Sequence, residues 1–327
     1  MKSLINRRSA LQMCSLPIAA LALPSRSKAQ DASQKTLKLM VGYPAGSTSD
    51  IVARMLAPHL SKGLGQSAIV ENKSGADGQI AAIEVLRAPA NGNTLFVATN
   101  SPLAAVPALR KVPPYDAMAD FTPIGFIGRY IHFLVVPPDL PVKSVAELIE
   151  HARAKPGGLS YAAGATFHKV ATAQLLRDAG VRMNEVPYKG EPAALIDVMA
   201  GRVQFMLASQ GVVLELIHSG KVRALATTAN TRHHSLPNVP TLKEAGLPLF
   251  TVMPWVGLFG PAGLPGETTG KINRELRVAL QQADVREQLD RIGIEVSAST
   301  PEEMRKLLRD QLEIWNRSVQ ELGIERT

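Results

Sequence analysis

LMVGYPAGSTSD, residues 39–50, is followed directly by the apolar run IVARML, residues 51–56. An apolar run, a Gly- and Ser-rich loop and a second apolar run with helical periodicity are typical of a strand that is followed by a helix. A second corner, LSYAAGATFH over residues 159–168, has the same construction. A helix start exposes backbone N–H groups and the positive end of the helix dipole. Two such starts across a cleft predict a binding protein for a small carboxylate-like solute, rather than a catalyst.

The N-terminal segment has the composition of an export signal. It contains the basic pair Arg7-Arg8, a mostly apolar run over residues 10–23, and the small-x-small cleavage site Ser27-Lys28-Ala29. The arginine pair fits either a twin-arginine signal or an ordinary Sec signal that happens to contain two arginines. We therefore expect a signal peptide over residues 1–29, cleavage near Ala29 and a location in the periplasm.

The composition of the rest of the chain excludes several classes of protein. The only cysteine, Cys14, lies in the predicted signal, so the mature chain is expected to fold without disulfides. The whole chain has 36 Lys and Arg against 28 Asp and Glu, and removing residues 1–29 leaves 31 against 28. No basic run is interleaved with aromatic residues, which argues against nucleic acid as a partner. No later stretch is apolar enough to span a membrane, so we expect a soluble mature chain.

Short strand-like runs alternate with helix-like runs along the chain, which is typical of α/β proteins. Strands are expected over residues 37–41, 68–71, 94–98, 132–136, 159–161, 204–207 and 222–227. Helices are expected over residues 50–64, 79–87, 145–154, 170–179, 193–200, 267–282 and 302–322. The length suggests two domains. The proline-rich residues 137–141 are expected just past one crossover between them, and residues 250–255 are expected to form another.

The predicted helix starts differ in whether a nearby side chain accepts hydrogen bonds from the free backbone N–H groups of the first turn. Capping boxes are expected at residues 144–147, 241–244 and 300–303. At the start after Gly164, Thr166 can cap, but Lys169 stands where a capping box has an acid. That leaves backbone donors and a positive charge open to a ligand. At the first corner, Ser47 and Asp50 could form a capping box between themselves or contact a ligand.

Five motifs occur in a specific order along the chain. They are YPAGSTSD at residues 43–50, VENKSGADG at 70–78, FTPIG at 121–125, VPYKG at 186–190 and WVGLFGPAG at 255–263. Their order and spacing resemble the extracytoplasmic solute receptors of tripartite tricarboxylate transporters, often called the Bug family, over essentially the whole mature chain. Ser47 stands where that family has a second glycine, and Ala162 and Ala165 stand where it tends to have a glycine and a serine. These departures from the family pattern are expected to affect which carboxylate is bound more than whether a carboxylate is bound.

The resemblance implies an α/β fold, a two-lobed periplasmic-binding-protein clamshell (type II like) in which each lobe is a mainly parallel sheet flanked by helices. Lobe 1 would comprise residues 30–130 and 252–327, and lobe 2 residues 131–251. The resemblance also implies a carboxylate held between the two corners by backbone groups and water, and docking of the closed form onto membrane permease subunits. No cofactor and no metal are expected, and such receptors are usually monomers.

Candidate ligand-binding residues follow the carboxyl ends of predicted strands, where pockets of α/β sheets form. They are Gly46, Ser47, Thr48, Ser49 and Asp50 in the first corner, Gly164, Ala165, Thr166, Phe167 and His168 in the second, and Asn100, Ser101, Ser209 and Gln210 after two other strands. His168 could instead be a structural histidine, and Trp255 could be hinge packing or a pocket wall. The pair His233-His234 is expected to be solvated rather than bound to a metal.

Together these features predict a periplasmic solute-binding receptor that captures a small mono-, di- or tricarboxylate and delivers it to a tripartite tricarboxylate-type transporter. The alternatives are a receptor for an ABC-type importer, a sensor module that presents its ligand to a receptor kinase, and an exported enzyme on the same fold. The sequence contains no Gly-x-Ser-x-Gly, His-Glu-x-x-His or Gly-x-Gly-x-x-Gly motif, which argues against the enzyme. Residues 266–272 resemble a phosphate loop but fail its spacing.

Overall fold

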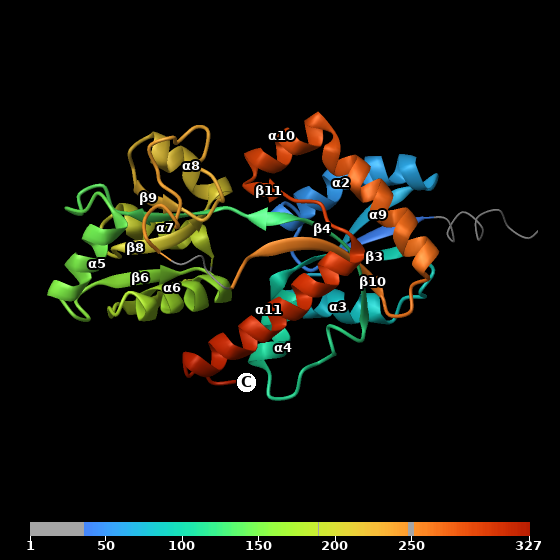
Figure 1. Cartoon of the computed structure of the whole chain (residues 1–327), viewed down its shortest axis with the longest axis horizontal. Helices are drawn as coiled ribbons and strands as arrows, with labels where there is room; N and C mark the ends of the chain where they lie inside the picture. The colour runs from blue at the N-terminus through green and yellow to red at the C-terminus, as the bar shows by residue number, and fades with distance from the viewer. Residues whose placement is uncertain (1–35, 189, 248–251) are drawn as a thin grey trace, which may run out of the picture. The chain divides into compact units, whose positions relative to one another are not determined.

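The structure is a computed structural model that describes residues 36–188, 190–247 and 252–327 (Figure 1). The predicted signal peptide over residues 1–29, with Cys14, lies outside the described residues. So do Lys189 and residues 248–251, of which 250 and 251 belong to the second expected crossover. Lys35–Thr327 form one compact unit.

Strands and helices alternate along this unit. The strands are β1 (Leu37–Val41), β2 (Ala68–Asn72), β3 (Thr94–Thr99), β4 (Phe121–Tyr130), β5 (His132–Val136), β6 (Ser160–Ala163), β7 (Asn184–Pro187), β8 (Phe205–Ser209), β9 (Arg223–Thr227), β10 (Trp255–Pro261) and β11 (Ile294–Val296). The helices are α2 (Thr48–Leu64), η1 (Ala76–Gly78), α3 (Gln79–Leu86), η2 (Ser101–Ala105), α4 (Val106–Leu109), α5 (Val145–Ala154), α6 (Thr166–Asp178), α7 (Glu191–Met199), α8 (Gln210–His218), α9 (Gly266–Gln281), α10 (Ala283–Arg291) and α11 (Pro301–Glu321). None of the helices among the described residues is both long and apolar enough to cross a membrane.

The first sheet has six strands in the order β11-β4-β10-β3-β1-β2. Strand β1 pairs in parallel with β2 and β3, whereas β10 runs antiparallel to both β3 and β4, and β11 antiparallel to β4. Side chains alternate between the faces of a strand. Leu39 and Val41 therefore pack with α2 and α9 on one face, while Met40 packs with α3 and α11 on the other. Helices cover both faces of this sheet (Figure 1).

The second sheet has five strands in the order β7-β6-β8-β5-β9. Strand β6 pairs in parallel with β7 and β8, and β5 runs antiparallel to β8 and β9. Leu134 and Val136 pack with α5 and α6, while Phe133 and Val135 pack with α7 and α8. The second sheet is therefore also covered by helices on both faces.

Both sheets are mixed, so the prediction of mainly parallel sheets is wrong in this detail. Strands β4 and β5 follow one another across Ile131 but belong to different sheets, and β10 joins the first sheet after the second is complete. A strand that enters from the other sheet need not run parallel to strands joined by a crossover helix. The expected lobe boundaries at residues 130/131 and 251/252 match this change of sheet but stay a prediction, because the unit is not divided there.

The sequence patterns identified most helix starts but not every strand. Thr300 forms a full capping box with Glu303 at the start of α11, with distances of 3.2 Å and 2.8 Å. The box at residues 241–244 also forms, but it closes a turn. Residues 266–272 are the first turns of α9 and not a phosphate loop. Strands β4 and β10 were missed because Pro123 and several glycines interrupt their apolar pattern.

Trp255, at the start of β10, is a core residue. Its side chain is completely buried and packs against Phe259, with the ring centroids 5.9 Å apart, in a cluster that also contains Met304. Its indole Nε1 has no hydrogen-bond partner among the residues described. Of the two alternatives for Trp255, the structure therefore supports packing, while the preceding Pro254 lines a pocket.

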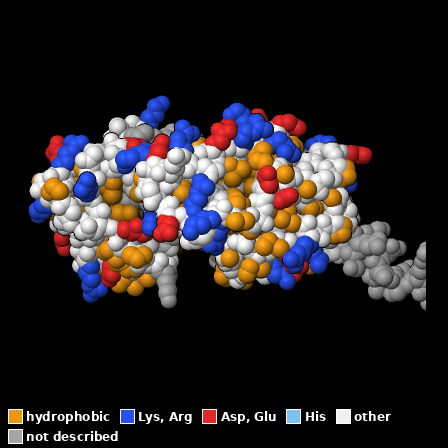
Figure 2. All heavy atoms as spheres, turned by 90° about the horizontal axis from the view of Figure 1, so that it is seen from below, with side chains coloured by type: hydrophobic (Ala, Val, Ile, Leu, Met, Phe, Trp, Pro, Cys, Tyr) orange, Lys and Arg blue, Asp and Glu red, His pale blue; other side chains and the backbone are white. Residues whose placement is uncertain are grey.

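Charged side chains of both signs are interspersed on the face of the molecule that Figure 2 shows. Elsewhere among the described residues, charged side chains also pair along their own helix, for example Arg291 with Glu287 at 3.0 Å and Lys306 with Asp310 at 2.6 Å. A protein that binds the phosphates of nucleic acid gathers its basic side chains on one surface. This face therefore does not have the charge distribution of a nucleic-acid interface.

Candidate functional site

A pocket of about 450 Å³ lies between the loops and helix starts that follow β1, β3, β6 and β8. Its walls therefore come from both sheets, at the ends where pockets of α/β folds form. The lining residues are Tyr43, Gly46, Ser47, Thr48, Ser49, Ile51, Thr99, Asn100, Ser101, Tyr130, His132, Ala165, Phe167, His168, Glu191, Ser209, Gly211, Val212, Pro254 and Ile292.

Ten of the predicted ligand-binding residues line this pocket. They are Gly46, Ser47, Thr48, Ser49, Asn100, Ser101, Ala165, Phe167, His168 and Ser209. The other four, Asp50, Gly164, Thr166 and Gln210, do not line it. The two corners and the two further strand ends thus meet at one pocket, and contact of these ten residues with a ligand stays a prediction.

Asp50 supports the first corner from behind. Its Oδ2 accepts hydrogen bonds from the Gly46 N–H and from Arg54 Nε, both at 2.9 Å, and its Oδ1 accepts one from Asn72 Nδ2 at 3.0 Å. Burial alone would raise the pKa of this carboxyl, but the bonds from Arg54, Gly46 and Asn72 outweigh burial and hold the pKa below its ordinary value. The structure therefore does not support the prediction for Asp50, whose carboxylate holds the loop and does not line the pocket.

We expect the substitution Asp50→Asn to lower the free energy of unfolding by about 1–2 kcal/mol. Both oxygens of Asp50 accept hydrogen bonds, so an amide must turn its NH2 group toward a donor on one side or the other. Urea unfolding followed by circular dichroism measures the change. Glu84→Gln, which removes a charge from an exposed residue, is the control and should have no comparable effect. Equal stability of the two variants would contradict a supporting role for Asp50.

The first corner presents neutral hydroxyl groups and a helix start to the pocket. Ser47 caps α2 by accepting a hydrogen bond from the Asp50 N–H at 3.4 Å. The Tyr43 hydroxyl lies 3.1 Å from Thr99 Oγ1. The Ser49 hydroxyl lies 3.2 Å from that of Tyr130, whose pKa burial raises well above its ordinary value. The phenol is therefore neutral at neutral pH.

Asn100 offers the pocket a free amide donor. The residue is only 4 % exposed, and its Nδ2 has no hydrogen-bond partner among the residues that the structure describes. A buried amide without a partner is costly, so nearly all such groups in proteins find an acceptor. Because Asn100 lines the pocket, this donor is available to a molecule that binds there.

The second corner leaves the start of α6 open. Its N-cap is Ala165, which has no side chain to cap with, and Thr166 is already the first helical residue. The capping role expected for Thr166 is therefore wrong, and the side chain does not line the pocket. Lys169 pairs with Glu185 at 3.3 Å and so has a protein partner. Gly164 lies beneath the corner, where its Cα faces the backbone of residues 190–191.

A buried polar cluster closes the pocket on the side of the second sheet. His168 Nε2 lies 3.2 Å from Glu191 Oε1, and Glu191 Oε2 accepts hydrogen bonds from Ser209 N at 2.8 Å and Ser209 Oγ at 2.6 Å. Burial would raise the pKa of Glu191, but His168, His132 and Ser209 together lower it to about 2. Burial and the nearby His168 lower the pKa of His132 to about 4. At neutral pH, Glu191 is therefore ionised and His132 neutral.

His132, His168 and Glu191 could also hold a metal ion, because each offers a ligand atom and these atoms all lie within 4.8 Å of one another. No metal site was expected from the sequence, and neither His132 nor Glu191 was among the candidate site residues. Glu191 directly follows the VPYKG motif, but an acid at a helix start is ordinarily explained by the helix dipole. No sequence signal connects it to His132, because the two residues meet only through the sheet.

Gln210 faces a different pocket, of about 290 Å³. Its Nε2 donates a hydrogen bond to the backbone oxygen of Asp290 at 2.7 Å, because α8 turns this side chain toward α10. The structure therefore does not support the predicted contact of Gln210 with a ligand of the first pocket. His233 and His234 also line this second pocket, and their candidate metal-ligand atoms lie within 4.8 Å of one another and of that of Asp290. His234 is exposed, but His233 is buried, so the expectation that both histidines are solvated is wrong for His233.

Sequence reasoning missed several residues of the first pocket. They are Tyr43, Ile51, Thr99, Tyr130, His132, Glu191, Gly211, Val212, Pro254 and Ile292. Tyr43 and Thr99 directly adjoin predicted site residues and could have been included on that basis. Ile292 follows α10, far along the chain from either corner, and nothing in its local sequence indicates a pocket.

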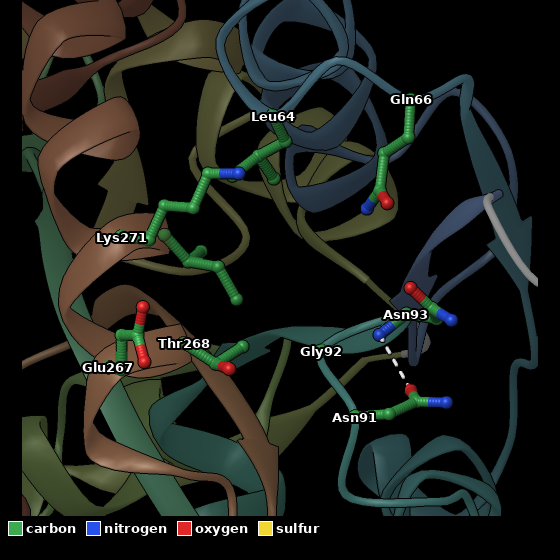
Figure 3. Close-up of a pocket in the computed structure, with 9 residues that line it drawn as sticks. Leu64, Gln66, Asn91, Gly92, Asn93, Glu267, Thr268 and Lys271 are labelled. Atoms are coloured by element: carbon green, nitrogen blue, oxygen red, sulfur yellow. Dashed lines mark hydrogen bonds between the residues drawn. The ribbon is translucent and has the colours of Figure 1, made fainter.

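A third pocket, of about 200 Å³, lies between the end of α2, residues 91–93 and the start of α9 (Figure 3). Lys271 and Glu267 come from α9, with Lys271 extending toward Leu64, and the Asn93 N–H donates to Asn91 Oδ1 at 3.0 Å. None of its lining residues belongs to the second sheet or to the predicted site. It is therefore the weaker candidate.

Comparison with known proteins gives three consistent findings. The family model described as "Tripartite tricarboxylate transporter family receptor" (TctC) matches residues 52–324. Protein BugT of Bordetella pertussis is 31% identical over 98% of this chain and 99% of that protein. The structure is similar to Rpa4515 of R. palustris with adipate (TM-score 0.76, 32% identity, 89% of this chain and 98% of the other). It is also similar to MatC of Rhodopseudomonas palustris with bound malate (TM-score 0.71, 31% identity, 87% and 98%).

Proposed function

Because the chain belongs to the TctC receptor family of tripartite tricarboxylate transporters, also called the Bug family, we propose that its pocket captures a small carboxylate for delivery to the membrane subunits of such a transporter. The chain is a periplasmic solute-binding receptor with the two-lobed fold of periplasmic binding proteins. Its family consists of transport receptors and not of enzymes. We also propose that the chain is exported by a Sec or twin-arginine signal, that this signal is cleaved near Ala29, and that the mature protein is a monomer.

The unpartnered Nδ2 of Asn100 is the single observation that best supports a carboxylate ligand. Around it lie the open start of α6, the start of α2, and the hydroxyls of Ser47 and Ser49. All of these groups can donate hydrogen bonds to carboxylate oxygens, which only accept them. No Lys or Arg stands among the lining residues that the structure describes. Neutral donors can hold an anion through hydrogen bonds that are weaker than those of a Lys or Arg side chain.

Adipate and malate, the molecules bound by the two solved relatives, support dicarboxylates as the first ligands to test. We expect native mass spectrometry of protein purified without added ligand to detect a small anion that leaves on denaturation. Thermal unfolding with mono-, di- and tricarboxylates then identifies the class. A ligand at a hundred times its Kd stabilises a protein by about 2.7 kcal/mol, which such an assay detects readily. Absence of a response to every carboxylate would contradict the proposal.

We expect Asn100→Ala to weaken binding of the best ligand about tenfold, which corresponds to the loss of one hydrogen bond. The variant should be as stable as the unaltered protein or more so, because the substitution removes a buried donor that has no partner. Isothermal titration calorimetry measures the affinity and urea unfolding the stability. Thr166→Ala is the matched control and should retain full affinity, since Thr166 does not line the pocket. An unchanged affinity in the Asn100 variant would contradict the assigned donor.

A further inference from the structure

The candidate ligand atoms of His132, His168 and Glu191 lie close together, but not yet as close as the ligands of a bound metal ion. The three atoms lie within 4.8 Å of one another. Bonds of about 2.0–2.2 Å around a tetrahedral zinc ion place neighbouring ligand atoms roughly 3.3–3.6 Å apart. The pair His168 Nε2 and Glu191 Oε1, at 3.2 Å, already has nearly this separation. The third ligand atom, which lies up to 4.8 Å from the other two, must move closer to reach the same distance.

The two imidazoles have the burial and the free atoms that a metal site needs. His132 is 4 % exposed and His168 2 % exposed, and both line the pocket. The Nδ1 atom of each has no hydrogen-bond partner among the described residues. Glu191 is oriented by the two hydrogen bonds from Ser209, as metal-binding carboxylates are oriented by groups behind them. A simple His168–Glu191 ion pair explains one contact of this cluster but leaves the Nδ1 atom of His132 without a partner among the described residues.

The charge of the pocket supplies an independent reason. Glu191 is the one Asp, Glu, Lys or Arg among the described lining residues, and it lies in a pocket that we propose to take an anion. An anionic side chain repels a carboxylate, and His168, which lies 3.2 Å from Glu191, compensates this charge only when it is protonated. A divalent cation bound to Glu191 and two neutral histidines reverses this local charge to a net +1. The carboxylate of the ligand could then occupy the open coordination position that faces the pocket.

We propose that His132, His168 and Glu191 bind a divalent cation of the zinc type, and that this receptor takes its carboxylate together with the metal. The proposal deepens the proposed function and rests on it, because the metal-bound carboxylate is the same ligand. Two imidazoles and one carboxylate favour Zn²⁺ over Mg²⁺ or Ca²⁺, which prefer sites built only from oxygen atoms. The open position distinguishes the site from a closed structural zinc site.

The test uses full-length mature protein that carries no histidine tag and has been dialysed against EDTA. Isothermal titration calorimetry is performed with Zn²⁺ alone, with malate alone, and with malate in the presence of Zn²⁺. We expect one equivalent of Zn²⁺ to bind, and malate to bind at least tenfold more tightly when Zn²⁺ is present. Because coupling between two ligands is reciprocal, malate should tighten the binding of Zn²⁺ by the same factor.

Three variants locate the metal. Glu191→Gln and His168→Gln should each weaken Zn²⁺ binding at least tenfold, and Glu191→Gln preserves the size of the side chain and an acceptor for Ser209. His234→Gln is the matched control, because it removes a ligand from the only other such group among the described residues, His233, His234 and Asp290. The His234 variant should still bind one equivalent of Zn²⁺ at the first pocket, and malate should still tighten that binding. Circular dichroism and the melting temperature confirm that each variant is folded.

The possible results separate this inference from the proposed function. If malate or another carboxylate binds the EDTA-treated protein and Zn²⁺ neither binds nor changes that affinity, the metal site is refuted and the carboxylate receptor stands. If Zn²⁺ binding persists in the Glu191 and His168 variants but is lost in the His234 variant, the assignment to this pocket is wrong. If Zn²⁺ binds but no carboxylate does, with or without the metal, the proposed function fails and so does the joint uptake.

Discussion

Replacement of Trp255 by alanine is expected to lower the free energy of unfolding by about 3–5 kcal/mol, the range measured for large aromatic residues in protein cores. The side chain is completely buried at the start of β10, where it packs on Phe259 in a core cluster that includes Met304 and Leu308 of α11. Its removal leaves a cavity that the surrounding strands and helix can only partly fill, because interiors are packed as densely as crystals. Urea unfolding followed by circular dichroism measures the loss.

Two further variants serve as controls for the Trp255→Ala result. Trp255→Phe should lose clearly less stability than the alanine variant, because it keeps an aromatic ring and the Nε1 atom that it removes has no partner among the described residues. Val112→Ala, at a residue that is 83 % exposed, should change stability by no more than about 0.5 kcal/mol. A loss of less than about 1 kcal/mol in Trp255→Ala would show that the core around β10 is not packed as described.

The substitution Gly164→Ala is expected to cost roughly 2–3 kcal/mol of stability, in the upper part of the range for overpacking. A Cβ at this position would lie 2.9 Å from both the Glu191 N and the carbonyl carbon of Gly190, and 3.2 Å from the Glu191 Cα. These are backbone atoms at the start of α7, so they cannot move aside as a flexible side chain can. The start of α7 must shift, and with it the Glu191 carboxylate that lines the pocket.

The same variant should therefore also weaken carboxylate binding, by at least tenfold, when the protein is folded. Gly266→Ala is the matched control, because a Cβ there meets no atom within 4 Å. It should keep both its stability and its affinity. Stability is measured by urea unfolding and affinity by calorimetry. Full affinity in Gly164→Ala would show that the position of α7 does not matter to the pocket, and would remove Gly164 from the set of residues that position the site.

The ends of several predicted elements agree with the structure because local chemistry determines them. Strand β1 covers the predicted residues 37–41, and α5 covers 145–154 after the Ser144 cap. Helix α11 begins at the capping box of Thr300. By contrast, α8 and α10 were not predicted, and the direction of β10 depends on its neighbours in the sheet. Strand direction is a property of the pair of strands, which a local pattern does not contain.

In the candidate site, too, some residues could be predicted from the local sequence and others could not. Gly46, Ser47, Ala165 and Phe167 could be predicted, since the residues that follow a strand and start a helix lie at a known edge of an α/β sheet. Asp50 and Thr166 were predicted from the same corners but do not line the pocket. Neighbouring residues of a helix point in different directions, about 100° apart. The sequence pattern locates a corner but not the side chain that faces the cavity.

The amino-acid sequence by itself determined the family, the α/β class, and the two corners whose helix starts meet at the pocket, because each depends on local patterns and motifs. Only the tertiary structure decided that both sheets are mixed, that Gln210 faces another pocket, and that His132, His168 and Glu191 form one buried cluster. These three residues lie on β5, α6 and α7 and are far apart in sequence. They meet because pairing within the second sheet and helix packing on it bring distant segments together, and that non-local geometry has no signature in a short stretch of sequence.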